Sequence, residues 1–122
     1  MFLGKDKYPK LDWMQVEITS LCDGACLYCP QTAYTKQWKN HSLSMRAFQS
    51  LRPAIASSSL VHLQGWGEPL LHPRLVDMVR EVKKTGAQVG TTTNATHLSR
   101  QAADSLVGAG MDLVAVSLAG TR

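Results

Sequence analysis

Three cysteines stand close together in the sequence and are the residues best suited to chemistry. They lie in the segment Cys22-Asp23-Gly24-Ala25-Cys26-Leu27-Tyr28-Cys29-Pro30, with the spacing C-x3-C-x2-C, and the chain has no cysteine outside it. Three thiols cannot all pair in disulfides, so the group indicates a soft-metal or iron–sulfur site. A four-iron cluster normally takes four ligands. Three thiolates would therefore leave one iron open to a ligand that is not protein.

Alternative roles for these cysteines stay open. A structural zinc site usually has four protein ligands, so a fourth would have to come from His41 or from elsewhere. Cys26-x-x-Cys29 could be a thioredoxin-like redox pair, but such pairs usually open a helix directly, and Cys22 would have no role. Three unrelated structural cysteines would rarely be spaced so tightly by packing alone.

Composition predicts a small globular domain. The chain has 122 residues, of which 44% are hydrophobic and 18% charged, which is ordinary for a single domain. No apolar run approaches the ~18–20 residues of a membrane span, and residues 1–10 lack the apolar centre of a signal peptide. Free thiols suit a reducing compartment, so we expect a cytoplasmic protein. The net charge of +4 is scattered along the chain, which gives no support for nucleic-acid binding.

Strand patterns alternate with helix patterns along the chain. The expected strands are residues 13–19, 60–64, 87–92 and 113–118. One helix is expected over residues 44–51, with Ser42 or Ser44 as its N-cap and Pro53 ending or kinking it. A second helix is expected to begin at Pro73 and to stop at residues 85–86. A third is expected to have Ser99 as its N-cap, Val107 among its inward residues and residues 108–110 as its terminator.

This alternation predicts an α/β protein with a parallel sheet and right-handed crossovers. In such sheets, ligands bind at the carboxyl ends of the strands. The unusual segments of this chain all follow strands: the cysteine loop, then residues 65–69 (GWGEP), 92–96 (TTNAT) and 117–121 (SLAGT). We therefore expect these segments to meet in one pocket at that edge.

The cysteine spacing, with an aromatic residue before the last cysteine and an apolar strand before the loop, resembles the cluster motif of the radical S-adenosylmethionine (radical SAM) superfamily. The resemblance implies a [4Fe-4S] cluster held by Cys22, Cys26 and Cys29, with the open iron chelated by the amino and carboxylate groups of S-adenosylmethionine. It also implies a partial (βα) barrel. With about four βα units, residues 1–122 would be the N-terminal portion of that core domain, truncated before strands five and six.

The resemblance also assigns residues to S-adenosylmethionine binding. Tyr28 would lie near the adenine, although loop packing explains it as well. Gly65-Trp66-Gly67-Glu68-Pro69 resembles the GGEP segment of the family, so Gly65, Gly67 and Glu68 would contact the methionyl amino group, with Trp66 serving packing. Asn94 matches an asparagine often found after the third strand, and an Asx-turn explains it equally well. Ser117 would meet the ribose hydroxyls, but a serine at a strand end needs no such role.

Two positions depart from the family pattern. Asp23 stands where an asparagine often follows the first cysteine, and Ala119 stands where an aspartate often follows the serine of the fourth strand. The second departure puts a carboxylate contact at that strand in doubt. Among the histidines, His62 is expected to be packed in the core or to line the pocket, and no partner is predicted for His41, His72 or His97.

The function implied by the resemblance is reductive cleavage of S-adenosylmethionine, which yields methionine and a 5′-deoxyadenosyl radical that abstracts hydrogen from a substrate. The substrate is unknown, and the layout looks most like the branch that modifies peptides or matures cofactors. A one-electron donor such as flavodoxin or ferredoxin would be a partner. The alternative is a non-catalytic fragment of such an enzyme that binds iron–sulfur or zinc.

Overall fold

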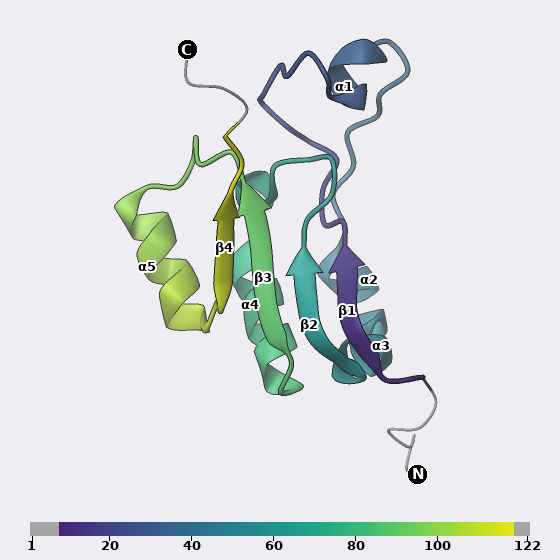
Figure 1. Cartoon of the computed structure of the whole chain (residues 1–122), viewed down its shortest axis with the longest axis vertical. Helices are drawn as coiled ribbons and strands as arrows, with labels where there is room; N and C mark the ends of the chain where they lie inside the picture. Colours follow the sequence, from purple (N-terminus) through teal and green to yellow (C-terminus); the bar gives the residue numbers. More distant parts are fainter. Residues whose placement is uncertain (1–7, 119–122) are drawn as a thin grey trace.

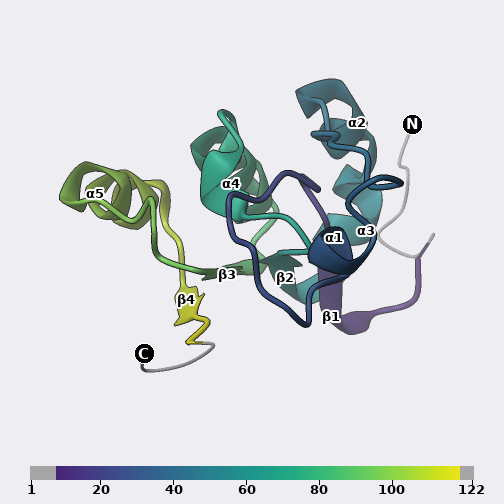
Figure 2. The ribbon, with the colours of Figure 1, turned by 90° about the horizontal axis from the view of Figure 1, so that it is seen from above.

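Four parallel strands form one curved sheet, and the long helices cover its convex face (Figures 1 and 2). The computed structural model describes residues 8–118. The strands, hydrogen-bonded in chain order, are β1 (Leu11–Val16), β2 (Ser58–Leu63), β3 (Gln88–Thr93) and β4 (Leu113–Val116). The helices are α1 (Pro30–Ala33), α2 (Met45–Ser50), α3 (Arg52–Ala56), the 3-10 helix η1 (Pro69–Leu71), α4 (Leu75–Lys84) and α5 (Arg100–Ala109).

The register of the strands explains which face is covered. Val16, Leu63 and Thr91 lie side by side on β1, β2 and β3, and all three are buried beneath the helices. Neighbouring residues point to the opposite face because side chains alternate along a strand. That face carries no helix in Figure 2. The predicted α/β fold with a parallel, barrel-like sheet is confirmed.

Helix ends follow the capping residues in the sequence. The side chains of Ser44 and Ser99 each accept a hydrogen bond of 3.1 Å from the backbone nitrogen three residues on, at the starts of α2 and α5. Gly110 ends α5 with a φ of 95°, a left-handed conformation that suits glycine. Ser44, rather than Ser42, is therefore the N-cap of α2.

Several predicted boundaries are wrong. β1 ends at Val16, because the chain beyond it pairs instead with the segment returning from the cysteine loop, through an antiparallel bridge between Thr19 and Ser42. The end of the helix ahead of Pro53 is as predicted, because α2 stops at Ser50 and Pro53 lies in the first turn of a separate helix, α3, where its missing N–H costs nothing. Pro73 is not the first residue of α4, which begins at Leu75.

The edge of the sheet at β4 and the helix beside it leave apolar side chains exposed. Val107 on α5 has the spacing of an inward residue but is 75% exposed, whereas Leu106 is buried. Val114 and Val116 of β4 are also exposed, although Val114 is in register with the buried Thr91. Within residues 8–118, no helix is long and apolar enough to cross a membrane.

Candidate metal centre at the carboxyl edge of the sheet

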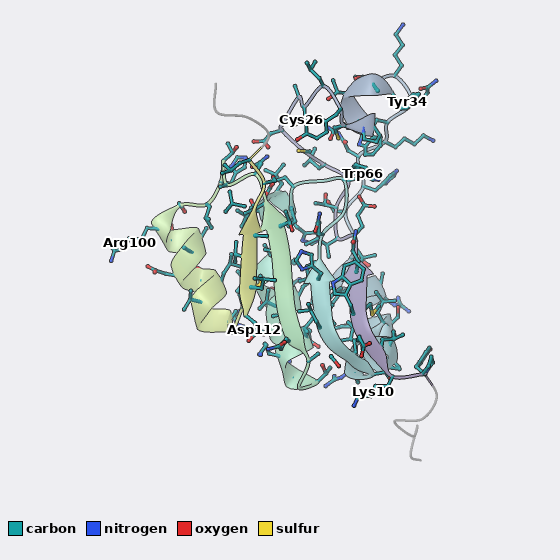
Figure 3. All side chains as sticks on the ribbon, in the orientation of Figure 1. Lys10, Cys26, Tyr34, Trp66, Arg100 and Asp112 are labelled. Atoms are coloured by element: carbon teal, nitrogen blue, oxygen red, sulfur yellow. The ribbon has the colours of Figure 1, made fainter. Side chains whose placement is uncertain are left out.

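The cysteine loop, residues 21–40, is closed at its base by backbone hydrogen bonds between the segments on either side of it. Ser20 N donates to His41 O over 2.9 Å, and Leu43 N donates to Ile18 O over 2.8 Å. The indole nitrogen of Trp38 donates to Ser20 O over 3.0 Å. These contacts fix where the loop leaves and rejoins the body of the protein. Figure 3 shows Cys26 and Tyr34 on this loop, beyond the strand ends.

All three cysteines are free, with Cys22 and Cys29 half-buried and Cys26 exposed. Gly24 lies between two of the sulfurs: a Cβ on it would be 3.4 Å from Cys22 Sγ and 3.8 Å from Cys26 Sγ. Burial raises the pKa of the Cys22 thiol, and the charges of Asp23, Glu68 and Cys29 add to this, while a hydrogen bond from Gly24 N opposes it.

This arrangement fits an iron–sulfur cluster. Across residues 8–118, no three side chains of His, Cys, Asp or Glu meet closely enough to hold a single metal ion. The donor set is nevertheless three thiols on one partly exposed loop, and soft thiolates are the usual ligands of such clusters. Gly24 has no side chain to fill the space between Cys22 and Cys26.

The two glycines of the GWGEP segment allow it to pack closely against the chain that enters the cysteine loop. A Cβ on Gly67 would stand 2.1 Å from Thr19 O, and one on Gly65 would stand 2.1 Å from Glu17 Cγ. Two hydrogen bonds of 2.8 Å complete the contact, from Glu68 N to Leu21 O and from Trp66 N to Glu17 Oε1. Gly67 is thus needed for close approach of the two backbones, whereas a side chain at Gly65 would displace the Glu17 side chain.

Glu68 is a buried link between two of the loops. Its side chain caps η1 by accepting a hydrogen bond from Leu70 N over 3.2 Å, and the residue is only 3% exposed. The same oxygen, Oε1, accepts from Thr93 Oγ1 over 2.5 Å, and Oε2 accepts from Asn94 N over 2.8 Å. Glu68 therefore joins the GWGEP segment to the end of β3.

Asn94 belongs to both the turn after β3 and the neighbourhood of the cysteine loop. Its Oδ1 accepts from Thr96 N over 3.0 Å, which is the expected Asx-turn. Its Nδ2 donates to Asp23 Oδ1 over 3.4 Å. Asp23 also pairs with His97 Nε2 at 2.5 Å, and this partner holds the pKa of the Asp23 carboxyl below its usual value.

The structure brings most of the predicted segments to one edge, but not every predicted residue faces the others. Ser117 lies beside β3, where its Oγ donates to Thr93 O over 3.3 Å. Tyr28 is 73% exposed. Trp66 is exposed at the strand ends (Figure 3), so a packing role for it can be only partial. Ala119 lies outside the described residues.

The histidines show what sequence patterns leave unassigned. His97 pairs with Asp23 across 74 positions of sequence, a contact that no local pattern could have predicted. His72 is buried and structural: Nδ1 accepts from Arg74 N over 3.0 Å, so Nε2 donates to Leu43 O. His62 bonds to Thr92 Oγ1 over 2.9 Å, and burial lowers its pKa.

The chain thus combines a parallel, barrel-like α/β sheet with a loop of three free thiols at the carboxyl edge of the sheet. Comparison with known proteins identifies the family: the model of the Radical SAM superfamily matches residues 16–122. The chain belongs to the radical SAM superfamily, whose members use a [4Fe-4S] cluster and S-adenosylmethionine.

Three relatives with assigned activities are similar in sequence. The tungsten-containing aldehyde ferredoxin oxidoreductase cofactor-modifying protein of Pyrococcus furiosus is 33% identical over 113 residues, covering 88% of this chain and 31% of that protein. The GTP 3′,8-cyclase of Chlorobaculum tepidum is 35% identical over 112 residues, covering 88% and 33%. The Fe-coproporphyrin III synthase of Methanosarcina barkeri is 31% identical over 120 residues, covering 98% and 29%. The chain thus spans about a third of the length of each.

A solved structure shares the fold. The crystal structure of BtrN in complex with AdoMet and 2-DOIA superposes with a TM-score of 0.77 at 22% identity, over 94% of this chain and 49% of BtrN. At this identity, the comparison establishes the architecture of the sheet and its helices.

Proposed function

We propose that this chain is the cluster-binding and S-adenosylmethionine-binding portion of a radical SAM enzyme, corresponding to the N-terminal part of its core domain. The observation that carries the proposal is the meeting of three segments at one edge: the cysteine loop, the GWGEP segment and the turn after β3. Cys22, Cys26 and Cys29 would hold a [4Fe-4S] cluster. Three protein thiolates leave the fourth iron for a ligand that is not protein.

The residues around the cluster site would bind and orient the cosubstrate. Gly65 and Gly67 let the backbone approach closely, and carbonyl or carboxylate oxygens there can accept hydrogen bonds from an ammonium group. Oε2 of Glu68 accepts one hydrogen bond within residues 8–118, which leaves it acceptor capacity. Asn94 and Ser117 would contribute polar contacts, and Tyr28, which is exposed on the loop, would lie near the adenine.

When bound, the reduced cluster and S-adenosylmethionine would supply a 5′-deoxyadenosyl radical for hydrogen abstraction from the substrate. The protein's part is to bind, to orient and to keep water away. The named relatives act on a cofactor, on GTP and in porphyrin synthesis. These names favour cofactor maturation over peptide modification as the branch. We propose a one-electron donor such as flavodoxin or ferredoxin, and a cytoplasmic location, because free cysteines suit a reducing compartment.

The test is anaerobic reconstitution of the chain with iron and sulfide, followed by electron paramagnetic resonance of the reduced protein with and without S-adenosylmethionine. We expect a [4Fe-4S] signal that changes on adding S-adenosylmethionine and is lost in Cys22→Ala, Cys26→Ala and Cys29→Ala. Glu81→Ala, a change on α4, is the control and should leave the signal intact. Zinc in place of iron, or a cluster indifferent to S-adenosylmethionine, would instead favour the non-catalytic alternative.

A further inference from the structure

Asp23 connects the cysteine loop to the turn after β3. Its Oδ2 lies 2.5 Å from His97 Nε2, and its Oδ1 accepts a hydrogen bond from Asn94 Nδ2 over 3.4 Å. The two partners come from the same turn and are three residues apart, so one carboxylate joins one loop to the other at two points. The side chains of Asp23 and His97 are 36% and 42% exposed, which places the contact at the rim of the site.

This contact stands alone along the loop. Within residues 8–118, the other hydrogen bonds made by residues 22–37 stay inside the segment 22–38. The outer part of the loop also has little packing, because Leu27, Tyr28 and Tyr34 are exposed. Beyond the base that closes it, and the hydrogen bond from Glu68 N to Leu21 O just before Cys22, the loop is therefore located on the sheet by Asp23.

Because Asp23 is next to Cys22 in the chain, its contact with the turn after β3 affects where the first thiol lies. It follows Cys22 directly, and consecutive Cα atoms are about 3.8 Å apart. On its other side, a Cβ on Gly24 would lie 3.4 Å from Cys22 Sγ and 3.9 Å from Asn94 Nδ2. A shift of Asp23 away from the turn would therefore move Cys22 away from Asn94.

The chemistry of the pair explains why an aspartate stands here. A carboxylate accepts at both oxygens, and both partners can donate, the amide through Nδ2 and the imidazole through Nε2. An asparagine at this position would offer one acceptor and turn an NH2 group toward the second donor. Asp23 and His97 are thus matched to each other.

We propose that His97 is a positioning residue that docks the cysteine loop on the turn after β3 through Asp23, and so sets the place of Cys22 beside the binding site. The importance of this contact for a binding site rests on the proposed function, whereas the contact itself does not. The docking belongs to the chain itself and exists without a cluster. It can therefore be measured on the reduced, metal-free protein.

The experiment is hydrogen exchange of the full chain, read by mass spectrometry in peptides covering residues 22–29. A partly exposed side-chain hydrogen bond contributes up to about 1 kcal/mol, so His97→Ala should speed exchange there about two- to fivefold. His97→Gln keeps an N–H donor and should restore much of the protection. His41→Ala, whose exposed side chain makes no hydrogen bond within the described residues, should match the wild type.

The docking would be overturned if residues 22–29 exchanged at the same rate in His97→Ala and the wild type, or if they already exchanged at the unprotected rate in the wild type. It would also be overturned if His97→Ala sped up exchange in β2 as much as in residues 22–29, because this would indicate global destabilisation. Cluster reconstitution of the same variants separates the two proposals. If no cluster forms but His97→Ala still frees the loop, the proposed function falls and the docking stands. If the cluster forms and responds to S-adenosylmethionine while exchange is unchanged, the docking falls alone.

Discussion

Replacing Glu68 tests whether the GWGEP segment is held by its own carboxylate before any cosubstrate binds. The side chain is almost fully buried and accepts from two backbone nitrogens and one hydroxyl, those of Leu70, Asn94 and Thr93. Glu68→Ala removes all three acceptor contacts at once. The donors that remain are at the junction of two loops, where the protein has to satisfy them by letting water in or by moving the backbone.

The magnitude follows from the cost of unpaired donors. Hydrogen bonds to a charged group contribute about 1.5–3 kcal/mol each, and each buried donor left without a partner costs about 1–3 kcal/mol. Because the three contacts share one carboxylate, their losses do not add, and we expect Glu68→Ala to lower the free energy of unfolding by about 3–5 kcal/mol. That is a large part of the roughly 5–15 kcal/mol typical of a domain.

Glu68→Gln is the finer test. Whichever way the amide is turned, its NH2 group meets a backbone N–H, either that of Leu70 or that of Asn94. We therefore expect a loss of about 1–2 kcal/mol. The hydroxyl of Thr93 can reverse its role and accept, so this variant should remain folded and can still be tested for S-adenosylmethionine binding.

The assay is urea unfolding of the metal-free protein, followed by circular dichroism. Asp104→Ala is the matched control, because the Asp104 side chain is 76% exposed on α5 and lies 4.0 Å from Arg100, so its loss should cost under about 1 kcal/mol. If Glu68→Ala falls within about 0.5 kcal/mol of that control, a difference of about the experimental error, the structural role is refuted. Glu68 would then serve the cosubstrate alone.

Three further predictions address other parts of the molecule. Gly67→Ala should cost about 2–3 kcal/mol in urea unfolding, because its Cβ would meet backbone, whereas Gly108→Ala in α5 has open space and should stabilise by about 0.5–1 kcal/mol. The pKa of Asp112 is lowered, first by its hydrogen bond from Lys83, so its contribution to stability is present above the unfolded pKa and is lost as pH falls through the folded one. In Asp112→Asn, the free energy of unfolding should therefore fall less steeply as the pH is lowered than it does in the wild type. An equally steep fall in both proteins would contradict this. Val116→Lys should reduce concentration-dependent association in analytical ultracentrifugation, since it places a charge on an exposed edge strand; equal association would show that this edge is not the contact.

Local chemistry made much of the fold predictable. Ser44 and Ser99 cap helices because a hydroxyl can accept from the free N–H groups of a first turn, and this depends only on nearby residues. The same holds for Gly110, whose conformation is costly for other residues. The four strands and their parallel order follow from the alternation of patterns. The meeting of the unusual segments at one edge follows from that order.

Contacts between distant segments were not predictable from the sequence. β1 stops at Val16 because Thr19 finds a partner in Ser42, which the alternating pattern of residues 13–19 does not reveal. Val107 has the spacing of an inward residue, yet it is exposed because the described structure has nothing beside α5 to cover it. In the candidate site, the family resemblance predicts that Glu68 contacts the cosubstrate, while its bonds to the end of β3 depend on how two loops fold together.

The site combines a fixed base with an exposed rim, and this division suits the proposed function. Gly67 and Glu68 join three segments through contacts that are buried and independent of any ligand. A site held in this way has its geometry set in advance, so little ordering cost falls on the cosubstrate. Cys26 and Tyr28, in contrast, are exposed on the outer loop, where the Cys26 thiol would be accessible for cluster assembly. The pair of Asp23 and His97 stands at the boundary between these two parts, and its loss should therefore affect the position of the loop more than the stability of the fold.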